Sequence, residues 1–364
     1  MKPRSTSVPS KSFRKYSTEI ANFAYSPQNK MKRTILSAVI LATTLFQLRS
    51  QTVDYAYADV RTGFSTHINP EETLSGFHVD YLNIHVGGKL ADKLSYRLRH
   101  RLTLPSYRDY NPLNATDMAL LEWRPTGRLR FVAGKQSVNV GGYEYDANPI
   151  NVYFWSSFVN NLYQFFMLGA CAGWELSEGQ EISFQFCQSP LSMGKSNCFA
   201  YNFYWRGSIA PWWHTTWCLN FMDSEYDRFM HFITLGNHFR FGKASLEVDL
   251  GNRNAIGQKR HFFTDWSAVT DFKYPLGKFV LGAKFTYDFN SSENVDEYGD
   301  SFNIVLPAGT EHLMGAAGFE YYPLDDRRLR LHAFYSWSNQ VYSSCNTLTM
   351  GLTWRMDFFR RDRR

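Results

Sequence analysis

The sequence predicts an all-β fold, a transmembrane antiparallel β-barrel of about sixteen strands, from three observations. Past Gln51 the chain repeats stretches of roughly ten residues in which every second residue is apolar. The connections between these stretches alternate between short turns and longer polar loops. Past Phe46 no apolar run approaches the roughly 20 residues that a membrane-spanning helix needs. A closed sheet also satisfies every backbone hydrogen bond in lipid, which an open sheet does not.

The segment Met31–Ser50 predicts a secretory signal peptide ahead of the barrel domain, which takes residues 51–364. Two basic residues precede an apolar stretch that is too short to span a bilayer, and an imperfect small-residue cleavage site follows. Because this signal begins at Met31, the simplest interpretation makes Met31 the initiator and residues 1–30 an upstream product of start-site choice. The alternative is a disordered tail before an uncleaved anchor. We expect an exported protein.

The alternation predicts a strand wherever it persists for about eight residues or more. The predicted strands cover residues 53–64, 75–88, 92–104, 117–124, 128–137, 166–177, 181–188, 198–208, 212–222, 230–241, 244–253, 263–274, 278–289, 311–322, 328–338 and 347–359.

The connections sort into two sets that alternate along the chain. Tight turns are expected at 89–93, 124–128, 177–181, 207–211, 242–243, 275–278 and 323–328. Longer loops are expected at 65–74, 105–116, 138–165, 189–197, 223–229, 254–262, 290–310 and 339–346. Outer-membrane barrels have short periplasmic turns and longer extracellular loops. The pattern therefore favours the outer membrane of a Gram-negative bacterium, with outer-membrane lipid around the strands.

The stretch KLSYRLRHRLTL, residues 93–104, alternates most strictly. Leu98 and its alternates would contact lipid, whereas Arg97, Arg99 and Arg101 would face an aqueous lumen. Positive charge is concentrated on the predicted strands between residues 92 and 137. The same alternation gives this set of pore-lining basic residues: Lys93, Arg97, Arg99, Arg101, Arg124, Arg128, Arg130, Arg206, Arg240, Arg328, Arg330 and Arg355.

Residues 138–165 form a long loop that is too apolar to lie freely in water. From Gln51 to Phe359 the chain resembles the phosphate-selective porin O and P family. The resemblance is carried by the sixteen-strand plan, the long third loop, the basic ladder and the segment LRFVAGKQSVNVGG at 129–142. It implies an inward-folded third extracellular loop that constricts the lumen, a homotrimer, and passive diffusion of phosphate-like or polyphosphate-like anions.

The loop departs from that family in its charge. No Lys or Arg occurs between Lys135 and Lys195, and the loop carries two carboxylates. A carboxylate pair facing an arginine wall would set up a transverse field, which would favour zwitterionic or polar neutral solutes over strict phosphate selectivity. From the basic ladder and this loop together we expect a diffusion channel for small anionic or polar solutes. We expect the constriction at this set of residues: Tyr143, Glu144, Tyr145 and Asp146.

Other functions receive less support from the residues. The chain has no GxSxG, HExxH, P-loop or CxxC spacing, so we expect no catalytic residues, no cofactor and no metal. The net charge of +6 is scattered over strands, which argues against nucleic-acid binding. Two alternatives stay open: a non-channel adhesion or structural barrel, and a lipid hydrolase with a Ser–His pair on the outer wall.

The five cysteines include two that flank one predicted tight turn. If Ser177 pairs with Glu181, Cys171 lies directly opposite Cys187 on the lumen face. Opposed Cβ atoms are about 4.5–5.5 Å apart, slightly beyond the usual disulfide spacing of about 3.5–4.5 Å. We therefore favour two free thiols over a bridge.

Overall fold

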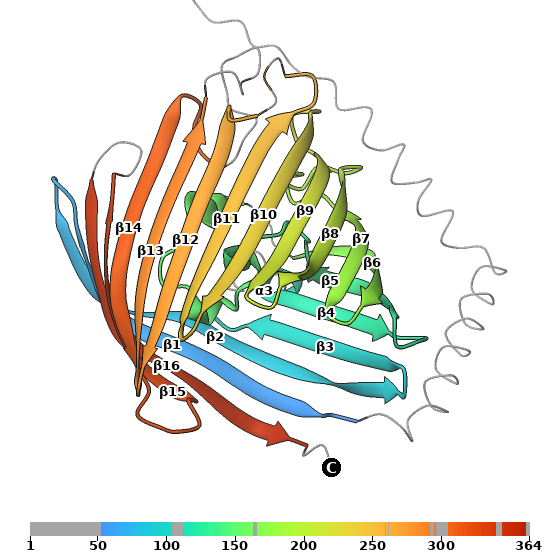
Figure 1. Ribbon diagram of the computed structural model, residues 1–364, viewed down its shortest axis with the longest axis horizontal. Helices are drawn as coiled ribbons and strands as arrows, with labels where there is room; N and C mark the ends of the chain where they lie inside the picture. Colours follow the sequence, from blue (N-terminus) through green and yellow to red (C-terminus); the bar gives the residue numbers. More distant parts are fainter. Residues whose placement is uncertain are drawn as a thin grey trace, which may run out of the picture. The chain divides into compact units, whose positions relative to one another are not determined.

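The chain folds into a closed β-barrel in which each strand pairs with its neighbours in sequence and β1 pairs with β16 (Figure 1). The computed structural model describes residues 52–103, 112–162, 166–258, 260, 262–291, 295, 305–339 and 344–361. The predicted signal peptide and the segment before it lie outside the described residues.

The described residues contain sixteen strands, as the alternation predicts, and all the pairings are antiparallel. The strands are β1 (Tyr55–Ile68), β2 (Thr73–Ala91), β3 (Leu94–Arg101), β4 (Thr116–Trp123), β5 (Leu129–Ser137), β6 (Phe166–Ser177), β7 (Gln180–Gln188), β8 (Phe199–Ala210), β9 (Trp213–Asp223), β10 (Phe229–Phe241), β11 (Ala244–Ala255), β12 (Asp265–Leu276), β13 (Phe279–Asn290), β14 (Thr310–Tyr321), β15 (Leu329–Ser338) and β16 (Cys345–Arg360). Short helical segments lie between strands: α3 (Pro112–Ala115), α4 (Tyr143–Asp146), η1 (Pro149–Asn151) and α5 (Ser157–Asn161). Within these described residues, no helix is long and apolar enough to cross a bilayer.

The two faces of the wall follow the predicted alternation. On β16, Leu348 and Trp354 are 43% and 46% exposed, whereas the inward Thr349 and Thr353 are buried. On β3, Leu98 is exposed while Arg99, its neighbour in sequence, is buried. Period-two chemistry therefore sorts apolar side chains outward and polar side chains into the lumen.

One predicted loop is wrong. Residues 65–74 are largely strand, because β1 and β2 pair as far as Ile68 opposite Thr73. The side chain of Asn69 accepts hydrogen bonds from the backbone N–H groups of Glu71 and Glu72 at 3.0 and 2.8 Å. These hydrogen bonds stabilise a turn of four residues, 69–72. The paired strands therefore extend further than composition predicts.

The predicted opposition of Cys171 and Cys187 is also wrong. Ser177 pairs with Gln180, and an irregularity between Glu175 and Ser177 shifts the register. Cys187 consequently lies opposite Gly169, two positions from Cys171. The cysteines are free and buried.

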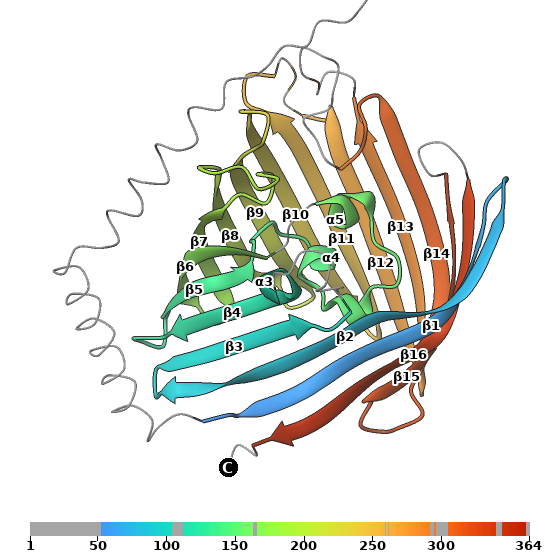
Figure 2. The same ribbon diagram turned by 180° about the vertical axis from the view of Figure 1, so that it is seen from behind.

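The lumen is partly filled by an apolar cluster between the loop and the wall. Val140 from the loop, Phe158 and Leu162 around α5, and Met230 and Phe232 on β10 are each 0–3% exposed. Figure 2 shows α4 and α5 within the ring of strands. The apolar composition of the loop, noted from the sequence, is accounted for by this packing.

Candidate functional site

The loop enters the barrel along the wall at a pair of glycines. Gly141 and Gly142 have φ of 86° and 94°, a region that side chains with a Cβ rarely adopt. A Cβ at Gly141 would lie 2.7 Å from the Cβ of Cys218 on β9. The backbone carbonyl of Asn139 accepts a hydrogen bond from the amide of Asn220 at 2.6 Å. The glycines therefore allow the loop backbone to lie directly on the wall.

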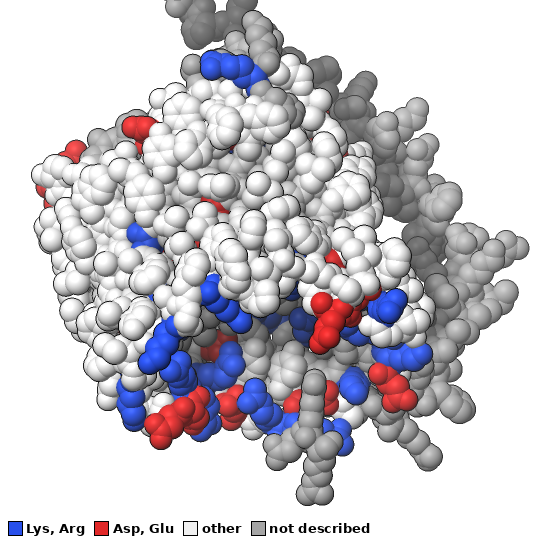
Figure 3. All heavy atoms as spheres, in the orientation of Figure 1, with Lys and Arg blue, Asp and Glu red and all other residues white. Residues whose placement is uncertain are grey.

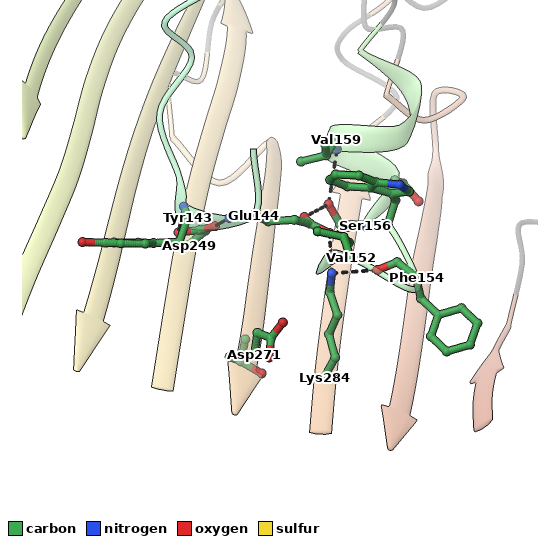
Figure 4. Close-up of polar contacts among 12 residues, drawn as sticks. Tyr143, Glu144, Val152, Phe154, Ser156, Val159, Asp249, Asp271 and Lys284 are labelled. Atoms are coloured by element: carbon green, nitrogen blue, oxygen red, sulfur yellow. Dashed lines mark hydrogen bonds and ion pairs between the residues drawn. The ribbon is translucent and has the colours of Figure 1, made fainter. Parts of the chain in front are cut away.

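The wall then caps the first helix of the loop. The carboxylate of Asp249 on β11 accepts hydrogen bonds from the backbone N–H groups of Tyr143 and Glu144, each at 2.8 Å (Figure 4). These N–H groups begin α4 and have no partner within the helix. A carboxylate there satisfies both donors and interacts favourably with the positive end of the helix.

Glu144 connects the start of the loop to its later part and to strand β13. Its carboxylate accepts hydrogen bonds from the backbone N–H of Ser156 at 2.8 Å and the Ser156 hydroxyl at 2.5 Å. It also forms an ion pair with Lys284 of β13, whose ammonium donates to the carbonyl of Phe154 at 2.7 Å (Figure 4). Glu144 is 5% exposed and pairs with this lysine rather than with the arginines of β3–β5.

Tyr153 anchors the far part of the loop. Its ring stacks on Phe334 of β15 with centroids 4.3 Å apart, and its hydroxyl donates to Glu320 at 2.7 Å. Burial raises the pKa of the Tyr153 phenol, so the hydroxyl keeps its proton and remains a donor. Arg61 and Arg330 donate to the carbonyl of Ile150. Cations of the wall thus satisfy a backbone carbonyl of the loop.

The other three expected constriction residues have different surroundings. Tyr145 is 8% exposed and belongs to the apolar cluster. The ring of Tyr143 lies 5.3 Å from that of His238. Asp146 accepts hydrogen bonds from Tyr204 at 2.5 Å and Arg206 at 3.1 Å, and burial raises the pKa of Asp146. The Asp146 carboxylate lines a cavity, described below.

A first cavity of about 810 Å³, the basic cavity, lies at the short-turn end beside β12–β16. Asn151 of the loop lines it. Its described lining has six cationic and three anionic side chains: Lys273, Arg327, Arg328, Arg330, Arg355 and Arg360 against Glu320, Asp326 and Asp357. Figure 3 shows Lys, Arg, Asp and Glu gathered around a hollow at this end of the barrel. The lining itself has an excess of positive charge, and this excess is reduced by Asp271 and Asp59, which lie outside the lining and pair with Lys273 and Arg355.

A second cavity of about 470 Å³, the mixed cavity, lies beside β3–β8. Its described lining has four cationic and four anionic side chains: Arg97, Arg124, Arg130 and Arg206 against Glu122, Asp146, Glu175 and Glu181. The expected excess of positive charge on the strands between residues 92 and 137 is therefore balanced here by carboxylates of β4, of the loop and of β6 and β7.

Most of the predicted pore-lining residues are ion-paired, and others lie in turns. Their ion pairs include Arg97–Glu122, Arg99–Asp117, Arg101–Asp117, Arg124–Glu122, Arg130–Glu181, Arg206–Asp146, Arg328–Asp326, Arg330–Glu320 and Arg355–Asp59. Lys93 donates to the carbonyl of Pro125 at 2.6 Å, Arg240 contacts His238 at 3.4 Å, and Arg128 is exposed just before β5.

Sequence reasoning missed several lumen residues. Lys273 shares a face with Asp271, so alternation alone could have identified it. Asp117 could not be identified this way, because the register shifts between Arg99 and His100 and leaves it without a strand partner. This bulge places the Asp117 carboxylate 2.9 and 2.8 Å from Arg99 and Arg101.

A Ser–His–Asp series also lies on the lumen face of β1 and β2. The Ser65 hydroxyl is 2.7 Å from Nε2 of His78, and Nδ1 of His78 is 2.7 Å from the Asp80 carboxylate. Asp80 is also paired with Arg61 at 2.9 Å. Among the described residues, no group of three or more His, Cys, Asp or Glu side chains is arranged to hold a metal ion.

The chain matches a family model and many solved barrels. The model described as phosphate-selective porin O and P matches residues 46–288. The outer membrane channel DcaP of Acinetobacter baumannii is similar, with a TM-score of 0.58 at 8% identity over 83% of this chain and 96% of that chain. The anion-selective porin from Comamonas acidovorans is similar with a TM-score of 0.55 at 10% identity, over 84% of this chain and 100% of that chain. The trimer form of OmpT, an outer membrane protein of Vibrio cholerae, is similar with a TM-score of 0.55 at 12% identity, over 84% of this chain and 99% of that chain. No curated protein sequence matches.

Proposed function

The chain belongs to the phosphate-selective porin O and P family of outer-membrane channels, and from this membership we propose that it is a diffusion channel for small anionic or polar solutes. The basic cavity is the observation that carries the proposal. Its excess of cations lowers the electrostatic cost of anion entry, and several weak sites along it let the anion leave again. Phosphate-like and polyphosphate-like anions belong to this class. The loop contributes no cation, which supports broad rather than strict phosphate selectivity.

The loop attached across the lumen is proposed as the constriction. It is held to β11 through Asp249, to β13 through Lys284 and to β15 through Phe334. Attachment at three separated strands keeps a segment of chain in the path of the solute. The lumen is narrowed by the loop backbone and by Asp146 and Asn151, which line the two cavities.

Reversal potential in a KCl gradient tests the selectivity. We expect the full-length protein in a planar bilayer to prefer anions. Lys273→Gln with Arg328→Gln should lower that preference, because both side chains line the basic cavity and are 39% and 50% exposed. Lys243→Gln, in the exposed turn between β10 and β11, is the matched control and should change nothing. Cation preference in the wild type would refute the proposal, and zero conductance would favour an adhesion or structural barrel.

The homotrimer is proposed from family resemblance and from the trimer form of the similar V. cholerae protein. Native mass spectrometry of the detergent-folded protein tests it. A purely monomeric species would exclude it.

A hydrolase is the second candidate function, favoured by the contacts among Ser65, His78 and Asp80. These residues face the lumen and not the outer wall where a lipid substrate would lie. Strand β1 is paired on both edges around Ser65, so the backbone N–H groups nearby serve the sheet and not an oxyanion. Labelling by a fluorophosphonate that is lost in Ser65→Ala would establish this function. Absence of labelling would eliminate it.

A further inference from the structure

The β3–β4 side of the mixed cavity has an excess positive charge. Arg97 and Arg124 both bind the carboxylate of Glu122, at 2.8 and 2.6 Å. One carboxylate cannot neutralise two guanidinium groups. Both arginine side chains remain about half exposed, at 49% and 51%, so they are accessible from the cavity. A solute carboxylate would find here two planar donors that suit its geometry.

The β5–β7 side has the opposite excess. Glu175 and Glu181 lie directly opposite each other in the β6–β7 ladder, and Arg130 pairs with Glu181. Like charges at opposed positions destabilise a sheet, so a second cation near this pair is favoured. A Cβ at Gly173 would lie 3.2 Å from both Arg130 and Glu181. The absence of a Cβ at Gly173 therefore lets the ion pair lie close against the wall.

An apolar floor lies next to these charges, on the strands between β3 and β7. Leu120, Val132 and Cys171 on β4, β5 and β6 are buried together, and Met118 packs against them. All four line the mixed cavity. The inner face of a water-filled barrel is ordinarily polar, so an apolar patch beside charged groups provides a place for an apolar group of a solute. On the remaining side Arg206 and Asp146 pair with each other at 3.1 Å and add no net charge.

We propose that the mixed cavity binds short zwitterionic solutes, with dipeptides as the best-fitting class; this inference rests on the proposed channel function. The solute carboxylate would bind Arg97 and Arg124, its ammonium would bind Glu175 and Glu181, and an apolar side chain would cover the floor. Strands β4 and β6 are two spacings, about 10 Å, apart. Two extended residues span about 7 Å, and the wall side chains reach across the remainder. The volume of about 470 Å³ suits such a ligand.

Three forms of one dipeptide test the proposal without any substitution. The probes are zwitterionic alanyl-leucine, its N-acetyl form, which is an anion, and its C-terminal amide, which is a cation. Saturation-transfer NMR on the detergent-folded full chain should show binding of the zwitterion about fivefold tighter than of either singly charged form, the upper end for one exposed ion pair. Equal affinity of the three forms would overturn the proposal.

Variants then locate the binding site. Glu175→Gln with Glu181→Gln should remove the advantage of the zwitterion over the acetylated form. Glu178→Gln, in the turn of the same hairpin and outside the cavity lining, is the matched control and should keep it. A zwitterion advantage that survives the double substitution would place the site elsewhere and refute the assignment. Bilayer reversal potentials are independent of this binding readout, so anion preference without a zwitterion advantage defeats this inference alone.

Discussion

Replacing Glu144 by Gln should loosen the loop without opening the barrel wall. The side chains of Glu144 and Lys284 are 5% and 10% exposed, so the substitution leaves a buried ammonium without its carboxylate. Removing one partner of a buried pair costs about 3–5 kcal/mol. The remaining bond from Lys284 to the carbonyl of Phe154 at 2.7 Å offsets only part of this cost. The hydrogen bonds between the strands do not involve this pair. The substitution should therefore weaken the attachment of the loop to the wall and leave the barrel itself folded.

Single-channel recording and hydrogen exchange measure this effect. We expect higher mean conductance, more current noise and faster exchange of residues 143–156 in Glu144→Gln. Adding Lys284→Met removes the stranded charge and should restore part of the docking. Asp227→Asn is the control, because it removes a carboxylate from an exposed ion pair with Lys195 and Asn tolerates the φ of 56° there. A folded Glu144→Gln protein with wild-type conductance and noise would refute the anchoring role.

Arg99→Gln should lower the free energy of unfolding by about 1.5–3 kcal/mol in urea titrations, because the Asp117 carboxylate, which is 1% exposed, loses one of its two cationic partners and keeps Arg101; full stability would mean that the bulge does not bury this pair. Leu98→Arg should destabilise the barrel by roughly 2–4 kcal/mol if the position is near the bilayer midplane, since Leu98 faces outward. A fully stable variant would mean that the two faces are reversed. Mass mapping without reductant should find free thiols at Cys171 and Cys187, and a linked pair would contradict the register of β6 and β7.

Strand number, strand position and the facing of side chains were predictable from the sequence. Their determinants are local: a period of two residues, turn chemistry and the alternation of short and long connections. The apolar loop was recognisable for the same reason, because its composition is incompatible with free exposure to water. Lys273 could also have been identified from its alternation with Asp271.

Charge pairing and register were decided only by the tertiary structure. Glu144 binds Lys284 across 140 positions of sequence, and no local pattern encodes that contact. Single-residue irregularities place Asp117 between two arginines and separate Cys171 from Cys187. A shift of one residue reverses the face of every side chain beyond it, and a closed barrel decides which wall each side chain meets. The sequence therefore determined the alternation of faces along the regular parts of the strands, and only the tertiary structure determined the facing of Asp117 and which charges remain available to a solute.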